Sequence, residues 1–224
     1  AYIGTFCFGK STDSFDIDGN IVETFEDKVA EDDIQSALKS FEGVIEQMPP
    51  IYSAIKIDGK KLYEYAREGK TVDINPRKVT IEKIELRSFD YENQIAEIYI
   101  KCSKGTYIRS IANDLGKALN NGCYLSKLVR VQAGQFLVNQ TTKLEDFTTL
   151  DIVKEHLINP LEYLPQPKQE LNDIEYNRAI HGMPIYNRIG ATDGIVILTK
   201  SGILVGISKV TDTGLKMSKI FVTD

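Results

Sequence analysis

Cysteine and histidine are scarce in this sequence, and their positions argue against both a disulfide framework and a structural zinc site. The three cysteines, Cys7, Cys102 and Cys123, are odd in number and irregularly spaced, which predicts reduced thiols rather than a disulfide framework. The two histidines, His156 and His181, lie far apart, and the sequence contains no Cys-x-x-Cys pair. A structural zinc site uses four such ligands, so we expect no bound metal.

Long apolar runs are missing too. No apolar stretch approaches the roughly 18 residues of a transmembrane helix, and the start of the chain does not resemble a signal peptide. Together with the reduced cysteines, this predicts a cytoplasmic protein without a membrane contact. The chain has 224 residues, of which 42% are hydrophobic and 26% charged. These values are typical of a globular protein with one ordinary domain and a second, smaller one.

A positive net charge, the usual mark of a nucleic-acid-binding protein, is also missing, because the formal net charge is −5. The charge is unevenly distributed, however. Residues 1–50 contain 3 Lys/Arg and 11 Asp/Glu, whereas residues 56–87 contain 9 and 6, and residues 101–130 contain 6 and 1. Charge alone leaves two interpretations open: a nucleic-acid surface, or a chance grouping on solvated faces.

The first part of the sequence predicts a strand, an acidic loop and a helix. Residues 2–8 are β-branched and aromatic, as in a strand. Residues 9–20 form a loop whose aspartate spacing resembles a calcium loop, but Thr24 stands where the twelfth-position glutamate is required, so we reject a calcium site. Residues 31–45 predict an amphipathic helix, with apolar residues on one face and acids in the first turn.

A segment rich in tyrosine, lysine and arginine follows. The paired prolines at 49–50 predict an extended entry. The sequence "IYSAIKI" (51–57) predicts a strand, "KLYEYAREG" (61–69) a short helix closed by its glycine, and residues 77–86 a second strand. Cations interleaved with aromatic rings are suited to holding a nucleic-acid backbone, although a solvated hairpin is the alternative.

Further along, the sequence predicts a strand that turns directly into a helix. Residues 96–103 predict the strand and residues 107–120 the helix, with Lys-Gly-Thr between them. Residues 124–136 are strand-like, and residues 143–164 are mainly helical in pattern.

Four motifs, taken in order, resemble the TruB family of tRNA pseudouridine synthases. They are "YIGTFCFGKSTDSFDIDGNIVE" (2–23), "QMPPIYSAIKIDGKKLYEYAREG" (47–69), "KCSKGTYIRSIANDLGKAL" (101–119) and "GCYLSKLVRVQAGQF" (122–136). The resemblance is collinear over about residues 1–164. In the tail it is much weaker, and there it is towards a PUA-like RNA-binding domain.

The resemblance implies an α+β fold. We expect a pseudouridine synthase domain over residues 1–164, with a mixed and largely antiparallel sheet flanked by helices. An RNA-binding thumb is expected as an insertion at about 52–80. Two prolines in a polar tract mark residues 165–169 as a linker. Short strands separated by glycine turns mark residues 170–224 as a small β-rich, PUA-like domain.

The resemblance also implies an activity. Family enzymes isomerise a uridine, here uridine-55 in the TΨC loop of tRNA, by flipping the base out of its stack and attacking it with an aspartate. The implied partner is therefore tRNA. We expect a monomer that needs no cofactor, no metal and no membrane.

The family's nucleophile lies in a Gly-Thr-Leu-Asp-Pro motif, which this sequence lacks. Asp151 in "TTLDIV" is without the flanking Gly and Pro and falls in an expected helix, so we interpret it as a surface residue. The chain opens on Ala1-Tyr2-Ile3 without an initiator methionine, already inside an expected strand. We therefore expect a fragment that begins after its own nucleophile and is inactive alone.

The motifs carry roles onto residues of this chain. Arg109 is expected to grip the catalytic aspartate through its planar guanidinium, and to have no partner of its own within residues 1–224. Tyr2 is expected to stack on the target base, with a general-base role open. Asp16, Tyr107 and Leu128 are expected to line the pocket, with turn or core roles as alternatives. Further substrate contacts are expected from Lys104, Gly105, Tyr52, Lys56, Lys60, Lys61, Arg67 and Arg130.

Two other functions remain open from the sequence. The first is a non-catalytic RNA-binding protein of the same family. The second, outside RNA, is a small acidic hydrolase that uses tyrosine and aspartate residues. No nucleophile elbow and no metal motif in the sequence supports that second function.

Overall fold

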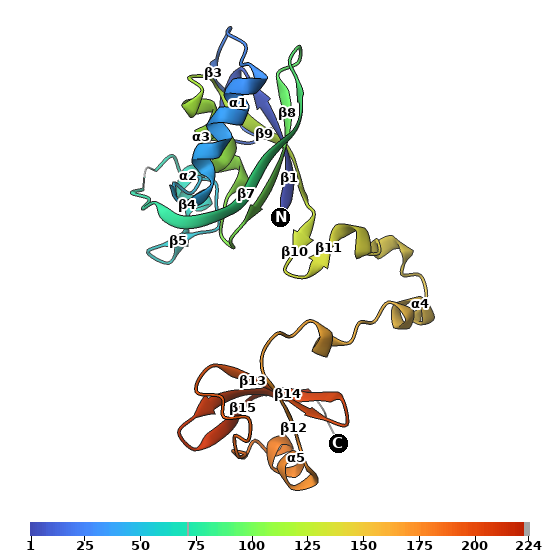
Figure 1. Cartoon of the computed structure of the whole chain (residues 1–224). Helices are drawn as coiled ribbons and strands as arrows, with labels where there is room; N and C mark the ends of the chain where they lie inside the picture. The colour runs from blue at the N-terminus through green and yellow to red at the C-terminus, as the bar shows by residue number, and fades with distance from the viewer. Residues whose placement is uncertain (71, 222–224) are drawn as a thin grey trace. The chain divides into compact units, whose positions relative to one another are not determined.

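The chain folds into two compact units, Ala1–Thr141 and Thr142–Asp224. The computed structural model describes residues 1–70 and 72–221 (Figure 1). The sequence placed the division at residues 165–169. In the structure it falls earlier, because the segment before those residues packs with the C-terminal unit, where Pro160 and Leu164 line a hollow together with strand residues. Each unit is described by itself below.

The N-terminal unit is built on a five-stranded antiparallel sheet in the order β4-β7-β8-β1-β9 (Figure 1). Its strands are β1 (Tyr2–Phe8), β4 (Gly43–Gln47), β7 (Arg77–Asp90), β8 (Ile95–Cys102) and β9 (Cys123–Arg130). Strand β1 lies between β8 and β9, so Tyr2 is opposite both Ile100 and Arg130. Residues at the two ends of this unit's sequence thus become neighbours.

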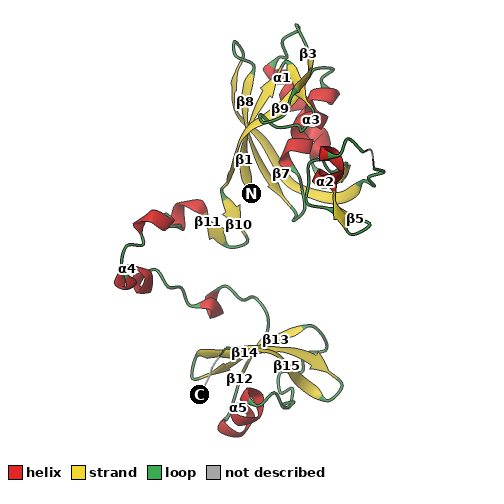
Figure 2. Ribbon diagram, turned by 180° about the vertical axis from the view of Figure 1, so that it is seen from behind, coloured by secondary structure: helices red, strands yellow, loops and turns green. Residues whose placement is uncertain are grey.

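Two helices, α1 (Glu31–Leu38) and α3 (Ile108–Ala118), pack on one face of this sheet, as Figures 1 and 2 show. In α3 the buried aliphatic residues Ile108, Ile111 and Leu115 are three and four positions apart and so share one face, as in an amphipathic helix, whereas in β8 every second residue from Ala96 to Ile100 is buried. The helices and the sheet therefore share one core, which includes Phe6, Ile34, Ile98, Ile100, Ile111 and Leu115.

Smaller elements extend from the N-terminal unit. Three two-stranded pairs occur: β2 (Lys10–Thr12) with β3 (Ile21–Thr24), β5 (Lys56–Ile57) with β6 (Lys60–Lys61), and β10 (Gln132–Ala133) with β11 (Phe136–Leu137). A short helix, α2 (Leu62–Arg67), follows β6 directly, and single 3₁₀ turns occupy Lys39–Phe41 and Val138–Gln140. The strand expected at 51–57 is therefore wrong for most of its length, and the expected strand over 124–136 is interrupted by a hairpin.

The helix expected over 31–45 is too long. It ends at Leu38, and the 3₁₀ turn leads to Gly43, whose φ of +90° is accessible to glycine but strained for other residues. From Gly43 the chain continues as β4, which pairs with β7. Long-range pairing thus overrides the local helical pattern.

The C-terminal unit holds a four-stranded sheet, β12 (Lys168–Glu170), β13 (Ile195–Lys200), β14 (Ile203–Thr211) and β15 (Gly214–Ile220), in that order. Helix α5 (Asp173–Ile180) packs against its core. The mainly helical pattern predicted for 143–164 is wrong: this segment contains α4 (Leu150–Glu155) and 3₁₀ turns at Leu144–Asp146 and Pro160–Glu162.

The predicted α+β fold class is confirmed, since both units combine largely antiparallel sheets with helices. Within residues 1–70 and 72–221, no helix is both long enough and apolar enough to cross a bilayer.

Candidate functional site

A tight turn joins β8 to α3. Gly105 has a φ of +84°, which an L side chain rarely adopts. Ser103 anchors the turn to β7, because its N–H donates to the carbonyl of Thr80 at 2.8 Å and its Oγ accepts from the Thr80 N–H at 3.0 Å. Thr106 Oγ1 donates back to the Ser103 carbonyl at 2.9 Å. Lys104 and Gly105 are exposed at the tip, so the turn presents a cation to solvent beside the start of the helix.

Helix α3 begins with two of the residues that the sequence singled out. Tyr107 is its N-cap residue, and Arg109 is its second residue. The Arg109 guanidinium carbon lies 5.9 Å from the centre of the Tyr107 ring, and Nη2 donates to the main-chain carbonyl of Tyr52 at 2.5 Å. The expectation that Arg109 has no partner in this chain is therefore wrong.

Arg109 nevertheless has no acidic partner in the part of the chain that the structure describes. Every ion pair found there joins other residues. Its guanidinium has five N–H donors, and its bond to Tyr52 uses one of them. The remaining N–H groups can donate to a carboxylate that binds in the cavity.

The predicted pocket residues meet in one cavity of about 290 Å³. Pairing of β1 with β9 brings Tyr2 opposite Arg130 and Gly4 opposite Leu128, and the first turn of α3 closes another side. The lining consists of Tyr2, Asp16, Thr106, Tyr107, Ile108, Arg109, Leu125, Leu128 and Arg130. The cavity thus combines two phenol rings, two guanidinium groups, one carboxylate and apolar walls.

The Tyr2 ring is held by Arg130. Arg130 Nε donates to Tyr2 Oη at 3.2 Å, and the guanidinium carbon lies 5.3 Å from the ring centre. A cation over an aromatic face is favourable by about 0.5–1 kcal/mol at exposed sites. Arg130 therefore holds the Tyr2 ring at the wall of the cavity.

Asp16 lies at the border between this cavity and a second one of about 320 Å³. Its carbonyl accepts from Thr12 Oγ1 at 2.9 Å, and the next residue, Ile17, donates its N–H to the carbonyl of Leu125 at 3.0 Å. The acidic loop is thus attached to β9. Arg109 lines both cavities as well, so Asp16 and Arg109 together form the partition.

The acidic loop does not gather ligands for a cation. Asp13 accepts hydrogen bonds from the main-chain and side-chain nitrogens of Asn20, both at 3.0 Å, and so closes the loop internally. In residues 1–70 and 72–221, no group of three or more His, Cys, Asp and Glu side chains could hold a metal.

In the predicted thumb over 52–80, three cations lie over tyrosine rings; residue 71 lies outside the described part. Lys60 Nζ is 4.9 Å from the centre of the Tyr65 ring, while Lys61 Nζ and the Arg67 guanidinium carbon are both 5.3 Å from the centre of the Tyr63 ring. Lys56 is exposed. None of these four cations lines either cavity, whereas Tyr52, at the root of the segment, lines the second one.

The sequence did not reveal two buried polar residues that join the end of β4 to the start of α3. Both Gln47 and Ser110 are buried: Gln47 bonds to the main chain of Tyr107 at the start of α3, and Ser110 Oγ donates to the carbonyl of Met48 just after β4. The available signal was a polar residue directly before a Met-Pro-Pro sequence.

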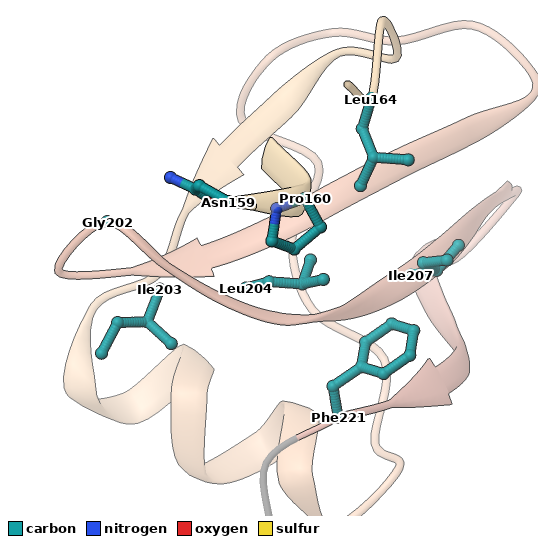
Figure 3. A pocket seen from close by; sticks show the side chains of 8 residues that line it. All are labelled: Asn159, Pro160, Leu164, Gly202, Ile203, Leu204, Ile207 and Phe221. Atoms are coloured by element: carbon teal, nitrogen blue, oxygen red, sulfur yellow. The ribbon is translucent and has the colours of Figure 1, made fainter. Parts of the chain in front are cut away.

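A larger hollow of about 690 Å³ lies in the C-terminal unit and has a different character (Figure 3). Pro160 and Leu164 of the connecting segment, Leu204 and Ile207 of β14, and Phe221 line it. It contains no ionisable side chain, so it offers apolar contact and no acid–base chemistry.

The chain is similar to known proteins along most of its length. Residues 1–108 match the family described as TruB family pseudouridylate synthase (N terminal domain). The chain is 41% identical to tRNA pseudouridine synthase B of Chromobacterium violaceum over 187 residues, covering 82% of this chain and 60% of that protein. It is 34% identical to the protein of the same name from Saccharophagus degradans, covering 99% of this chain and 75% of that protein.

Solved structures share the fold at lower identity. A Cbf5-Nop10-Gar1 complex matches with a TM-score of 0.66 at 21% identity, covering 99% of this chain and 66% of the matched chain. An H/ACA RNP bound to a substrate RNA containing 2′-deoxyuridine matches with a TM-score of 0.65 at 18% identity, covering 99% and 65%. The chain thus spans about two thirds of these structures and less than two thirds of the Chromobacterium protein. With its motifs, its fold and these relatives considered together, the chain belongs to the TruB family of pseudouridylate synthases.

Proposed function

We propose that the protein containing this chain is a tRNA pseudouridine synthase that converts uridine-55 of the TΨC loop into pseudouridine. The observation that carries the proposal is the cavity in which Tyr2, Tyr107, Arg109 and Leu128 meet. A flipped uridine needs an aromatic or apolar surface on which to lie, and an attacking carboxylate needs a fixed cation to aim it. The relatives named tRNA pseudouridine synthase B support tRNA as the substrate.

The proposed chemistry is an isomerisation. An aspartate carboxylate gripped by Arg109 attacks the uridine, the glycosidic bond to nitrogen breaks, and the ring is rejoined to the ribose through carbon C5. The proton on C5 leaves, N1 takes up a proton, and the bond between the aspartate and the substrate breaks again, so atoms and electrons balance without a cofactor. Tyr2, held by Arg130, stacks on the base, and stacking of this kind contributes about 1–3 kcal/mol per base. Asp16, between the two cavities, contacts the substrate from the loop side.

The proposed RNA contacts lie outside the cavity. The segment 52–80 acts as a thumb on the phosphate backbone, with Lys104 adding a contact from the turn before α3. Residues 170–224 act as a PUA-like RNA-binding domain. The thumb's own contacts would come from four cations, Lys56, Lys60, Lys61 and Arg67, whose charges attract phosphates and release counterions on binding, and from the uncharged side chain of Tyr52. We propose that the protein works as a monomer in the cytoplasm.

Tritium release tests the proposal directly. An unmodified tRNA transcript labelled with tritium at uridine C5 loses its label when the ring is rejoined through C5. The natural protein that contains this chain should release one tritium per tRNA, and a transcript with cytidine at position 55 should release none. Release of equal size from both transcripts would contradict the assigned position, and release from neither would contradict the activity.

A second function is supported by one observation. Arg109 has a main-chain partner but no acidic one among the residues that the structure describes, which fits a family member that binds RNA without reacting. In that case the natural protein would bind the transcript in a salt-dependent manner and would release no tritium.

A further inference from the structure

Three glutamines among the described residues are almost completely buried: Gln47, Gln94 and Gln169 are 2%, 8% and 1% exposed. A buried side-chain amide is costly unless its oxygen and its nitrogen both find partners. In all three, both ends of the amide bond to main-chain atoms of a distant segment. Buried glutamine is thus a recurring brace in this fold, and one of the three braces lies beside the proposed site.

Gln47, the last residue of β4, reaches the residue from which α3 starts. Its Nε2 donates to the carbonyl oxygen of Tyr107 at 3.0 Å, and its Oε1 accepts from the Tyr107 N–H at 2.8 Å, across 60 residues of sequence. The amide therefore pairs with one residue at two points. This pairing fixes Tyr107 in the extended conformation of a helix N-cap, with φ −97° and ψ 108°.

The main chain of Tyr107 decides where the first turn of α3 lies. Its carbonyl also accepts from the N–H groups of Ser110 and Ile111, at 3.1 and 3.2 Å, which begins the helical hydrogen bonding. Tyr107 and Arg109 both line the cavity. A displacement of the Tyr107 carbonyl would therefore move the whole first turn and the guanidinium that it carries.

Gln47 itself lines neither cavity, so any effect on chemistry must act through Tyr107. Strand β4, which carries Gln47, is one of the two edge strands of the five-stranded sheet. The residue after it, Met48, accepts from Ser110 Oγ at 3.0 Å. The end of β4 and the start of α3 are consequently fixed to each other, with the Gln47 amide setting the position of the cap residue.

We propose that Gln47 is a positioning residue for the isomerisation, which holds the first turn of α3 so that Tyr107 and Arg109 face the flipped uridine and the attacking carboxylate. The inference rests on the proposed function. It deepens that function by assigning a role to a residue that touches neither substrate nor nucleophile. Reacting groups tolerate little displacement, and an error of about 1 Å can cost on the order of a hundredfold in rate.

Gln94 provides a matched control. Its Oε1 accepts from the N–H of Val29 at 2.8 Å and its Nε2 donates to the Val29 carbonyl at 3.3 Å. Val29 precedes Ala30, the N-cap residue of α1. Gln94 thus makes the same two-point contact before the other helix of the unit, with one further bond from Nε2 to the carbonyl of Tyr91 at 2.8 Å. Neither Gln94 nor Val29 lines either cavity.

The experiment compares Gln47→Met with Gln94→Met in the natural protein that contains this chain. Methionine has a similar length and shape but makes none of these hydrogen bonds, so both variants should melt at lower temperature. Tritium release at several tRNA concentrations gives kcat and KM. We expect Gln47→Met to lose about ten- to a hundredfold in kcat with KM little changed, and Gln94→Met to keep the wild-type kcat. Gln47→Glu retains an acceptor for the Tyr107 N–H and should keep more kcat than Gln47→Met.

Equal kcat values for Gln47→Met and Gln94→Met would overturn the inference, because the loss of either glutamine would then affect only the stability of the protein. If Gln47→Met does not fold, the comparison of Gln47→Glu with Gln94→Glu replaces it, and equal kcat values there would overturn the inference in the same way. A wild-type protein that releases no tritium would overturn the proposed function, and this inference with it. The wild-type measurement therefore separates the two failures.

Discussion

Arg109 donates a hydrogen bond from Nη2 to the main-chain carbonyl of Tyr52 at 2.5 Å, across 57 residues of sequence. The contact joins the first turn of α3 to the root of the segment 52–80. Both residues line the cavity beside the acidic loop. The arginine that we propose positions the nucleophile is therefore hydrogen-bonded to the segment that we propose binds RNA. A movement of that segment would shift the guanidinium.

A polypeptide of residues 1–224 alone is expected to release no tritium from a labelled tRNA transcript. The reason is local: no carboxylate in the described part of the chain pairs with Arg109, and the Gly-Thr-Leu-Asp-Pro motif does not occur in the sequence. The assay is the one described for the proposed function. Release at the rate of the natural protein would contradict this prediction, and Asp13 and Asp16 would then be the first carboxylates to substitute.

Substitution of both Lys60 and Lys61 by alanine is expected to weaken tRNA binding. Each neutralised phosphate contributes to the slope of affinity against salt concentration, so the double variant should flatten that slope by roughly one to two contacts. Glu68 forms an ion pair with Lys60, which favours the lower value. Binding measured at several salt concentrations gives the slope directly.

Lys28→Ala is the control for that prediction. Lys28 has the same surroundings as Lys60, since its Nζ lies 4.9 Å from the centre of the Tyr91 ring and forms an ion pair with Glu92 at 2.7 Å. It lies outside the segment 52–80. An unchanged slope in the double variant, or an equal change in Lys28→Ala, would show that the thumb lysines are merely solvated.

The members of the candidate site could be predicted because they stand in motifs that resemble a known family, and the structure brings these residues together in one cavity. Gly105 at positive φ lies in the turn that presents Lys104 before α3, and the sequence identifies both strands, β1 and β9, that pair beside the cavity, although it does not predict their pairing. The partners of these residues could not be predicted. The carbonyl of Tyr52 is a main-chain atom that any residue supplies, so nothing in the sequence marks it as a ligand of Arg109.

The fold was predicted less evenly, for physical reasons that particular residues show. Residues 143–164 have apolar residues at helical spacing, yet Leu144, Leu150 and Leu157 are 87%, 77% and 72% exposed. Most helical stability comes from packing of an apolar face, and these three side chains are not among those that form the core of their unit. The predicted long helix is accordingly reduced to α4 and single turns.

Glu175→Gln is expected to destabilise the C-terminal unit at neutral pH. Arg188 donates from Nε and Nη2 to the two carboxylate oxygens of Glu175, both at 2.9 Å, and the Asn172 N–H donates at 3.0 Å. Burial raises the pKa of the Glu175 carboxyl, but the hydrogen bonds from Arg188 and Asn172 outweigh it and hold the pKa below its ordinary value. The loss should be about 1.5 kcal/mol, at the low end for charged hydrogen bonds because Arg188 is half exposed.

The stabilisation by Glu175 is expected to depend on pH and to disappear in acid. Since the folded-state pKa of Glu175 is lower than the unfolded one, the stabilisation is complete above the unfolded value and is lost as the pH falls through the folded value. Unfolding curves of the wild type and Glu175→Gln should therefore differ at pH 7 and converge as the pH falls below about 4. A difference that persists undiminished into strong acid would mean that the carboxylate charge is not responsible.

Arg109→Lys in the natural protein is expected to abolish most turnover while leaving tRNA binding nearly intact. Lysine keeps the positive charge, so the long-range attraction to RNA is preserved. It lacks the planar fork that lets Arg109 bond the Tyr52 carbonyl and still present two donors to a carboxylate.

The loss of a charged hydrogen bond at a site where charge must be aimed costs roughly 2–4 kcal/mol, or about thirty- to a thousandfold in rate. Single-turnover tritium release measures the rate, and titration of the tRNA measures binding. Arg87→Lys serves as the control, because Arg87 also lies over a tyrosine ring, 4.9 Å from the centre of Tyr99, but lines neither cavity. If Arg109→Lys turned over like the control, Arg109 would act through its charge alone, and the two-point grip on the nucleophile would have to be abandoned.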